Sequence, residues 1–124
     1  MNEVLIYLGG ALTIVWGTAH LYPTAAIVRG FGDISRENQL VLTMEWLSEA
    51  VLLIFTGLLV VLMAARFGVH DAAAQTTFAA ASTMLLVWAV VSAATGGRVD
   101  FVMYRLCAPI FALSASLILI GAFG

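Results

Sequence analysis

The sequence predicts an all-α membrane protein built as a bundle of four transmembrane helices. Of its 124 residues, 63% are apolar and only 10% are charged, whereas soluble domains contain about 45–50% apolar and about 25% charged residues. The mean hydropathy is +1.08. Four apolar segments occur, and each is long enough for the about 20 residues that a helix needs to cross the hydrocarbon core. Because little chain remains outside them, residues 1–124 are predicted to form a single integral membrane domain.

The first half of the chain holds two predicted spans and the longest predicted loop. The first span covers about residues 4–22 and ends at Pro23, which cannot continue a helix. Residues 29–39 are the most polar stretch, and the Asp-Ile-Ser sequence at 33–35 offers side chains that cap the next helix. The second span covers about 40–66. It is longer than a bilayer needs, so it is predicted to tilt or to project into the headgroup layer.

The second half holds two further predicted spans. The third span covers about residues 72–95, and its many alanines suit close contacts between helices. Two glycines at 96–97 end it. The fourth span covers about residues 101–123 and contains Pro109, which a membrane bundle tolerates as a kink.

The arginines predict the orientation. Three arginines in the first and third turns and one at the start of the fourth span contrast with a single arginine on the other side: Arg29, Arg36, Arg98 and Arg105 against Arg66. Positive residues favour the cytoplasmic side. We therefore expect a multi-pass protein of the cell inner membrane with both termini on the outer side. The net charge of −2 supplies no basic surface for nucleic acid.

Ionisable residues of three spans are predicted to converge near one membrane face. Glu45 and Glu49 are four residues apart, which places both carboxylates on one helix face. His20 ends the first span and Arg105 begins the fourth, and both share a helix stripe with small residues that suit an inward face. The pattern predicts a one-sided polar cup, in which Glu45, Glu49 and His20 transfer protons and Arg105 clamps an anionic group.

Charge balance predicts that this cup binds a proton. Two glutamates against one arginine leave a negative charge that is costly to bury. Either one glutamate stays protonated or His20 becomes charged, so one proton should bind or leave between about pH 5 and 8. A plainer interpretation is an ion pair between Arg105 and a glutamate that only fixes packing. A metal site formed by His20, Glu45 and Glu49 is disfavoured because Arg105 would repel a cation.

Aromatic residues and the single cysteine complete the candidate set. Trp16, Trp46 and Tyr104 fit the aromatic belt at a membrane interface, and the alternative is that they line the cup and bind a ligand. Cys107 is the only cysteine, so it forms no disulfide within the chain, and it is interpreted as a small packing residue.

The first two spans carry a resemblance to a known family. Leu8-Gly9 and Gly17 lie in the first span, and the second span has Glu49 followed by Leu52-Leu53 and by Gly57-Leu58-Leu59. In these features the chain resembles the small DoxX-like four-helix membrane proteins. The resemblance implies a four-helix bundle in a prokaryotic inner membrane, and some members of that family are subunits of quinone-linked sulfur oxidation.

Three functions therefore stand as hypotheses. The leading one is binding of a hydrophobic or amphipathic small molecule, such as a quinone or lipid, with proton transfer at the cup. The alternatives are a proton-coupled small-molecule transporter that uses Glu49, and a structural subunit of a larger membrane complex. The sequence contains no cofactor motif, so redox work would need a partner subunit. Small residues at Ala72, Ala79 and 80–82 favour a homo-oligomer.

Overall fold

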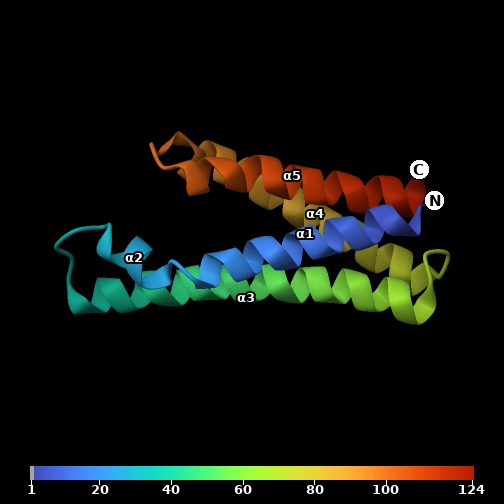
Figure 1. Ribbon diagram of the computed structural model, residues 1–124, viewed down its shortest axis with the longest axis horizontal. Helices are drawn as coiled ribbons and strands as arrows, with labels where there is room; N and C mark the ends of the chain where they lie inside the picture. The colour runs from blue at the N-terminus through green and yellow to red at the C-terminus, as the bar shows by residue number, and fades with distance from the viewer. Residues whose placement is uncertain (1) are drawn as a thin grey trace.

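The computed structural model describes residues 2–124 as a bundle of helices, with no strand among them (Figure 1). Four of the helical segments are long and apolar enough to cross a membrane, which confirms the predicted fold class. Both chain ends lie at the same end of the bundle. The helices are α1 (Glu3–Leu21), α2 (Thr24–Arg29), α3 (Arg36–Phe67), α4 (Ala72–Ala94), the short 3-10 helix η1 (Gly96–Arg98) and α5 (Val102–Phe123).

The beginning of α3 differs from the prediction. It starts at Arg36 rather than near residue 40, because the Ser35 hydroxyl caps it by accepting a hydrogen bond from the Asn38 amide at 3.1 Å. The polar residues before position 40 are therefore the first turn of the helix. At about 1.5 Å per residue, its 32 residues span about 48 Å, well beyond a hydrocarbon core of about 30 Å. This length agrees with a helix that tilts or projects into the headgroup layer, and which of the two applies stays a prediction.

The short helix α2 was not predicted. Pro23 separates it from α1, and the Thr24 hydroxyl donates a hydrogen bond to the Leu21 carbonyl at 2.8 Å. The helix packs beside the start of α3 (Figure 1). Only residues 30–35 of the predicted loop lack helical structure.

Helix α1 is the central element, because it packs against α3 on one side and α5 on the other. Glycines allow this close approach. A Cβ atom at Gly17 would lie 2.9 Å from the Ala50 carbonyl of α3, and one at Gly9 would lie 2.8 Å from the Ser114 carbonyl of α5. Such small residues are typical of membrane helix interfaces, where packing rather than water exclusion drives association.

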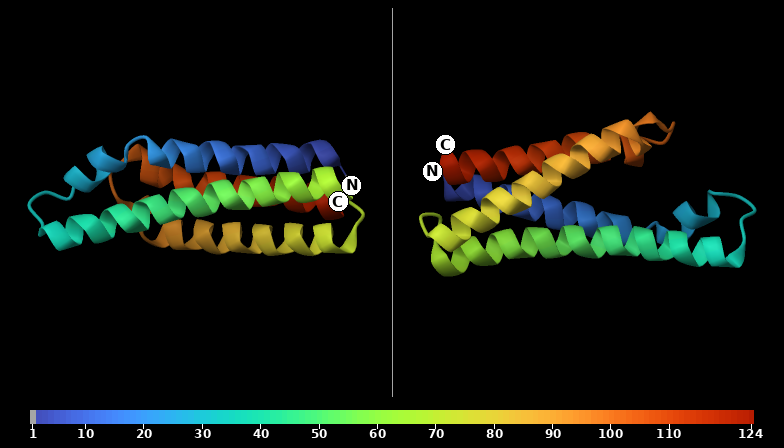
Figure 2. Two further views of the ribbon diagram at one scale, coloured as in Figure 1. Left: turned by 90° about the horizontal axis from the view of Figure 1, so that it is seen from below. Right: turned by 180° about the vertical axis from the view of Figure 1, so that it is seen from behind.

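Helices α3 and α4 separate along the bundle. Helix α4 begins beside α3 at the short turn that joins them, and it ends beside α5 (Figure 2). It accordingly packs far more extensively on α5 than on α3. At the end of the bundle that carries α2, the two helices therefore stand apart.

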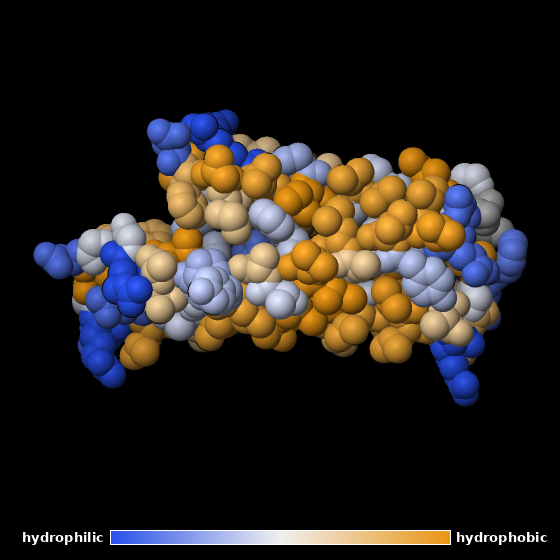
Figure 3. All heavy atoms as spheres, in the orientation of Figure 1, coloured by the Kyte–Doolittle hydropathy of each residue, from blue (hydrophilic) through white to orange (hydrophobic). Residues whose placement is uncertain are grey.

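The outer surface suits lipid. Apolar side chains form a belt between hydrophilic ends on the face shown in Figure 3. Exposed large residues occur on every long helix, as at Val15, Phe55, Val90 and Ile120. The chain is thus a multi-pass membrane protein by length, composition and surface.

Two of the small residues predicted to favour a homo-oligomer lie inside the bundle. Ala81 and Ser82 are buried within the bundle, on the face of α4 that also buries Phe78 and Leu85. They cannot contact a second copy there. Ala80 and Ala72 are exposed, so self-association through α4 stays a prediction that concerns only its outer face.

Candidate functional site

A pocket of about 860 Å³ lies between α3 and α4, at the end of the bundle where these helices separate. Small-molecule sites commonly enclose about 300–1,000 Å³. Apolar side chains from several elements form its walls, including Ile27 of α2, Leu52 of α3 and Val91 of α4. Its polar and aromatic lining includes His20, Trp46, Glu49, Trp88, Tyr104 and Cys107.

Three polar groups of the pocket lie at the same depth along the bundle. His20 is 17 residues from the start of α1, Glu49 is 18 from the end of α3, and Cys107 is 16 from the end of α5. At about 1.5 Å per residue these positions lie about 24–27 Å from the other end of the bundle. All three groups therefore share one depth, at a distance slightly shorter than the about 30 Å thickness of a hydrocarbon core.

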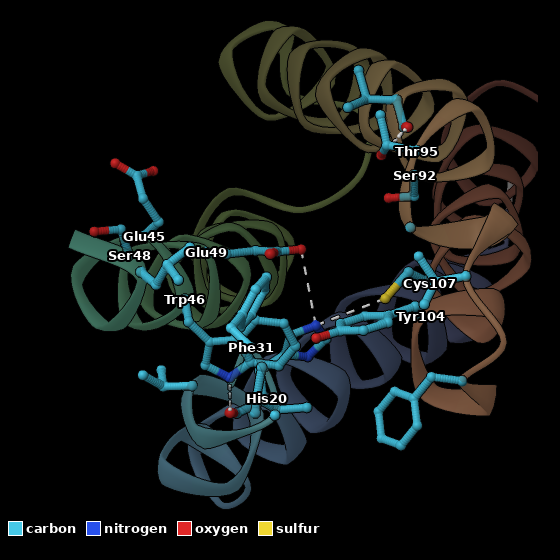
Figure 4. A pocket seen from close by; sticks show the side chains of 18 of the residues that line it. His20, Phe31, Glu45, Trp46, Ser48, Glu49, Ser92, Thr95, Tyr104 and Cys107 are labelled. Atoms are coloured by element: carbon cyan, nitrogen blue, oxygen red, sulfur yellow. Dashed lines mark hydrogen bonds and ion pairs between the residues drawn. The ribbon is translucent and has the colours of Figure 1, made fainter. Parts of the chain in front are cut away.

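His20 is the most buried polar group of the pocket, with 2% of its surface exposed. Its Nδ1 lies 2.8 Å from the Trp16 carbonyl oxygen. A carbonyl only accepts, so Nδ1 carries the proton and donates it to this bond. The other nitrogen, Nε2, lies 3.9 Å from Oε1 of Glu49 and 3.8 Å from Sγ of Cys107 (Figure 4). His20 is therefore inward-facing, as predicted, and presents Nε2 to both groups.

Aromatic rings hold the imidazole in place. Trp46 stacks on it with ring centroids 5.0 Å apart, and the Trp46 indole nitrogen donates a hydrogen bond to the His20 carbonyl at 2.6 Å. Tyr104 contacts the edge of Trp46 at a centroid distance of 5.8 Å. Trp46 and Tyr104 line the pocket, as the ligand-binding interpretation expected. Trp16 instead contacts the edge of the imidazole, with centroids 5.5 Å apart.

The two predicted glutamates do not share one environment. The Glu49 side chain is 32% exposed and faces His20. Glu45 also borders the pocket, but it is exposed and points away from His20 (Figure 4). It lies one helical turn farther toward the end where α4 has moved away from α3, so no neighbouring helix covers it. Only Glu49 joins the cluster.

The predicted inward position of Arg105 is wrong. Its side chain is 53% exposed, and its guanidinium pairs with Asp100 at 3.0 Å. Its Nε also donates to the Val99 carbonyl at 3.2 Å. The small-residue stripe misled the prediction, because Ser116 on the same stripe is exposed. Since Arg105 contacts the preceding loop, the cluster consists of one carboxylate, one imidazole and one thiol, and no guanidinium group among the described residues balances the Glu49 carboxylate.

Cys107 is the residue that the sequence analysis missed. It is buried in the core, as a packing residue would be, but it also lines the pocket and places Sγ against His20. A signal was available in the sequence. Counted from the helix ends, Cys107 and His20 lie at the same depth, and the interpretation as a packing residue did not use this.

Comparisons with protein-family models, with curated proteins and with solved structures find no match for this chain. The resemblance to the DoxX-like proteins therefore stays a prediction.

The geometry of the site limits the chemistry that it can perform. Within residues 2–124, no group of three or more His, Cys, Asp or Glu side chains is arranged to hold a metal ion. What the pocket offers is a buried imidazole nitrogen flanked by a carboxylate and a thiol. These groups can donate, accept and exchange protons in a mostly apolar cavity.

Proposed function

We propose that this membrane protein binds a hydrophobic or amphipathic small molecule, of the quinone or lipid class, in the pocket between α3 and α4. One observation carries the proposal: the walls are mostly apolar, and the buried Nε2 of His20 and the Glu49 carboxylate stand together on one side of the cavity. Binding sites for small molecules typically combine an apolar lining with a few polar groups that orient the ligand. The pocket thus suits a molecule with an apolar body and a hydrogen-bonding head.

The position of the pocket supports access from lipid. It lies where α3 and α4 separate, on the side of the bundle that faces the hydrocarbon. Leu52 of α3 and Val91 of α4 line it and are themselves 42% and 50% exposed. A ligand dissolved in the bilayer can therefore enter sideways without crossing water.

His20 and Glu49 also support proton exchange with the ligand. Nε2 accepts a hydrogen bond while the imidazole is neutral and donates one once it is charged. Glu49, 3.9 Å away, stabilises the charged form. A bound carbonyl or hydroxyl group would thus meet both a proton donor and a proton acceptor. A quinone reduced at this site would receive its electrons from a partner subunit.

We place the protein in the cell inner membrane with both termini outside, so that the pocket opens in the cytoplasmic leaflet. The distribution of arginines supports this orientation. Arg29, Arg36, Arg98 and Arg105 belong to the pocket end and Arg66 to the other end. Alkaline phosphatase fused after residue 124 should then be active in cells, and an inactive fusion at normal expression would reverse the orientation.

Ligand binding is tested with the protein in lipid nanodiscs and decylubiquinone as the probe, because quinones quench tryptophan fluorescence and Trp46 and Trp88 line the pocket. Glu49→Gln should weaken binding by roughly tenfold or more, since a hydrogen bond to a charged group contributes about 1.5–3 kcal/mol. Ser92→Phe, which fills the cavity, should abolish quenching.

Glu37→Gln is the matched control. It removes the same charge from the same helix at an exposed position in the first turn, outside the pocket, and should bind as the unaltered protein does. Equal quenching in all three variants, at unchanged helix content, would show that the probe binds elsewhere and would refute the pocket as the site.

A further inference from the structure

The Cys107 thiol has neighbours that suit a nucleophile. Nε2 of His20 lies 3.8 Å from Sγ, and the Met103 carbonyl accepts from the thiol at 3.4 Å. The Trp16 indole is another neighbour. Its nitrogen is buried and has no hydrogen-bond partner among the described residues. A base and a spare N–H donor therefore stand beside one sulfur atom that lines a pocket.

The tautomer of His20 makes it a base toward this thiol. The bond from Nδ1–H to the Trp16 carbonyl leaves the lone pair of a neutral imidazole on Nε2, which is the nitrogen that faces Sγ. A thiol beside such a nitrogen can pass it a proton and become a thiolate, the reactive form of cysteine. Glu49 lies 3.9 Å from the same nitrogen and would stabilise the resulting imidazolium.

We propose that Cys107 is a nucleophile that accepts the acyl group of a long-chain ester or thioester bound in the pocket. This inference rests on the proposed function, because the same pocket must hold the amphipathic substrate. The cavity provides space for an apolar chain, and its lining includes the exposed side chains of Leu52 and Val91. Activated acyl groups combine such a chain with an electrophilic carbonyl carbon, and a thiol paired with an imidazole attacks that type of carbon.

The reaction balances without an external oxidant or reductant. The thiol proton moves to Nε2 of His20, and the sulfur forms a C–S bond to the carbonyl carbon while the C=O π electrons move to oxygen. The tetrahedral intermediate then re-forms C=O, and the bond to the leaving alcohol or thiol breaks. That leaving group takes the proton back from Nε2. The products are an acyl thioester on Cys107 and the free alcohol or thiol.

The Trp16 indole serves the same step. Its unpartnered N–H can donate to the sulfur once the sulfur carries negative charge, which favours the thiolate. Donors aimed at a developing charge in a dry site are a general means of lowering a reaction barrier. Trp16 is a positioning residue before the reaction, because its carbonyl fixes the orientation of His20.

The experiment measures acylation of Cys107 by intact-protein mass spectrometry, in two arms that separate the acyl sources. In one arm the protein sits in ether-lipid nanodiscs, which contain no ester, and receives palmitoyl-coenzyme A. In the other it sits in nanodiscs of an ester phospholipid, phosphatidylglycerol, with no coenzyme A. An acyl adduct that hydroxylamine removes is expected in at least one arm, and it should be absent from Cys107→Ser.

Variants test the assigned base. His20→Gln should slow adduct formation by roughly 100-fold or more, the usual scale of general-base catalysis. Because His20 is buried and its loss can disturb folding, Glu49→Gln provides a second test at a half-exposed side chain, and it should also slow the reaction. Glu37→Gln, on the exposed first turn of α3, should react at the rate of the unaltered protein.

The outcomes separate this inference from the proposed function. A protein that quenches with decylubiquinone but forms no adduct in either arm would overturn the nucleophile and leave the pocket function standing. If the protein showed neither quenching by decylubiquinone nor an acyl adduct, both the pocket function and the role of Cys107 as a nucleophile would be overturned. If the adduct formed as fast in His20→Gln and Glu49→Gln as in the unaltered protein, the reaction would be spontaneous acyl exchange. The assigned role of His20 as the base would then be wrong.

Discussion

The two ends of this bundle are built from the same four long helices and packed in opposite ways. At the end that carries the chain termini, Ile6, Phe78 and Ile118 are almost fully buried, and Gly10 and Gly57 bring the backbones of α1 and α3 together. At the end that carries α2, the same helices surround a pocket of about 860 Å³. The difference arises from α4, which leaves α3 and follows α5 (Figure 2).

This comparison shows where ionisable groups can be placed in a membrane bundle. In the middle of the bundle the buried hydroxyls of Thr13 and Thr56 donate to carbonyls of their own helices, at 2.8 and 2.7 Å. These hydroxyl groups therefore have their hydrogen-bond acceptors within their own helix. His20 and Glu49 instead meet across two helices, beside open space. The closed end is tightly packed, and the open end is where we propose that a ligand binds.

The largest expected effect on stability is at the closed end. A Cβ atom at Gly57 would lie 2.5 Å from the Gly10 carbonyl, and no rotamer change relieves a clash between backbones. Gly57→Ala should therefore destabilise the bundle by about 1–3 kcal/mol, the usual cost of overpacking. Unfolding in mixed micelles, followed by circular dichroism, measures the change.

Gly96→Ala is the control, because a Cβ atom there would meet only Tyr104 at an ordinary 3.5 Å. It should leave stability nearly unaltered. If the two variants were equally stable, close approach of α1 and α3 would not be what holds the closed end together.

A smaller effect is expected at the open end from Trp46→Phe. The ring can still stack on His20, but the 2.6 Å hydrogen bond to the His20 carbonyl is lost. This should cost about 0.5–1.5 kcal/mol of stability and weaken decylubiquinone binding by several-fold, since the imidazole is less firmly held. Calorimetric titration is the suitable measurement, because the substitution also removes a fluorophore. If stability fell while the affinity for decylubiquinone stayed unaltered, the contact of Trp46 with His20 would matter for stability and not for ligand binding.

The smallest effect is expected for Arg105→Ala. Its partner Asp100 is 97% exposed, and exposed ion pairs contribute less than about 1 kcal/mol. Ligand affinity and acylation of Cys107 should both be unaltered. A variant that lost binding at unchanged helix content would restore the original expectation that Arg105 clamps an anionic group.

The site was predictable only in part. The inward position of His20 follows from the small residues on its helix stripe, and counting along the spans places His20 and Glu49 toward the same membrane face, so both could be predicted. The side to which Arg105 turns depends on the conformation of residues 99–101, which brings Asp100 within reach. The contact of Cys107 with His20 depends on the rotation of α5 relative to α1. Neither relation is encoded in the spacing of residues along a single helix.

Composition and length alone determined that lipid surrounds this chain and that four helices cross it, because a backbone in hydrocarbon must satisfy its hydrogen bonds within each segment. The tertiary structure alone decided that α3 and α4 separate and that a thiol, an imidazole and a carboxylate meet beside the opening. Those relations depend on how ridges of side chains from distant segments pack and set the angles between helices. Such packing brings together residues that are distant in the sequence, as His20 and Cys107 are. It exists only once all four helices are assembled.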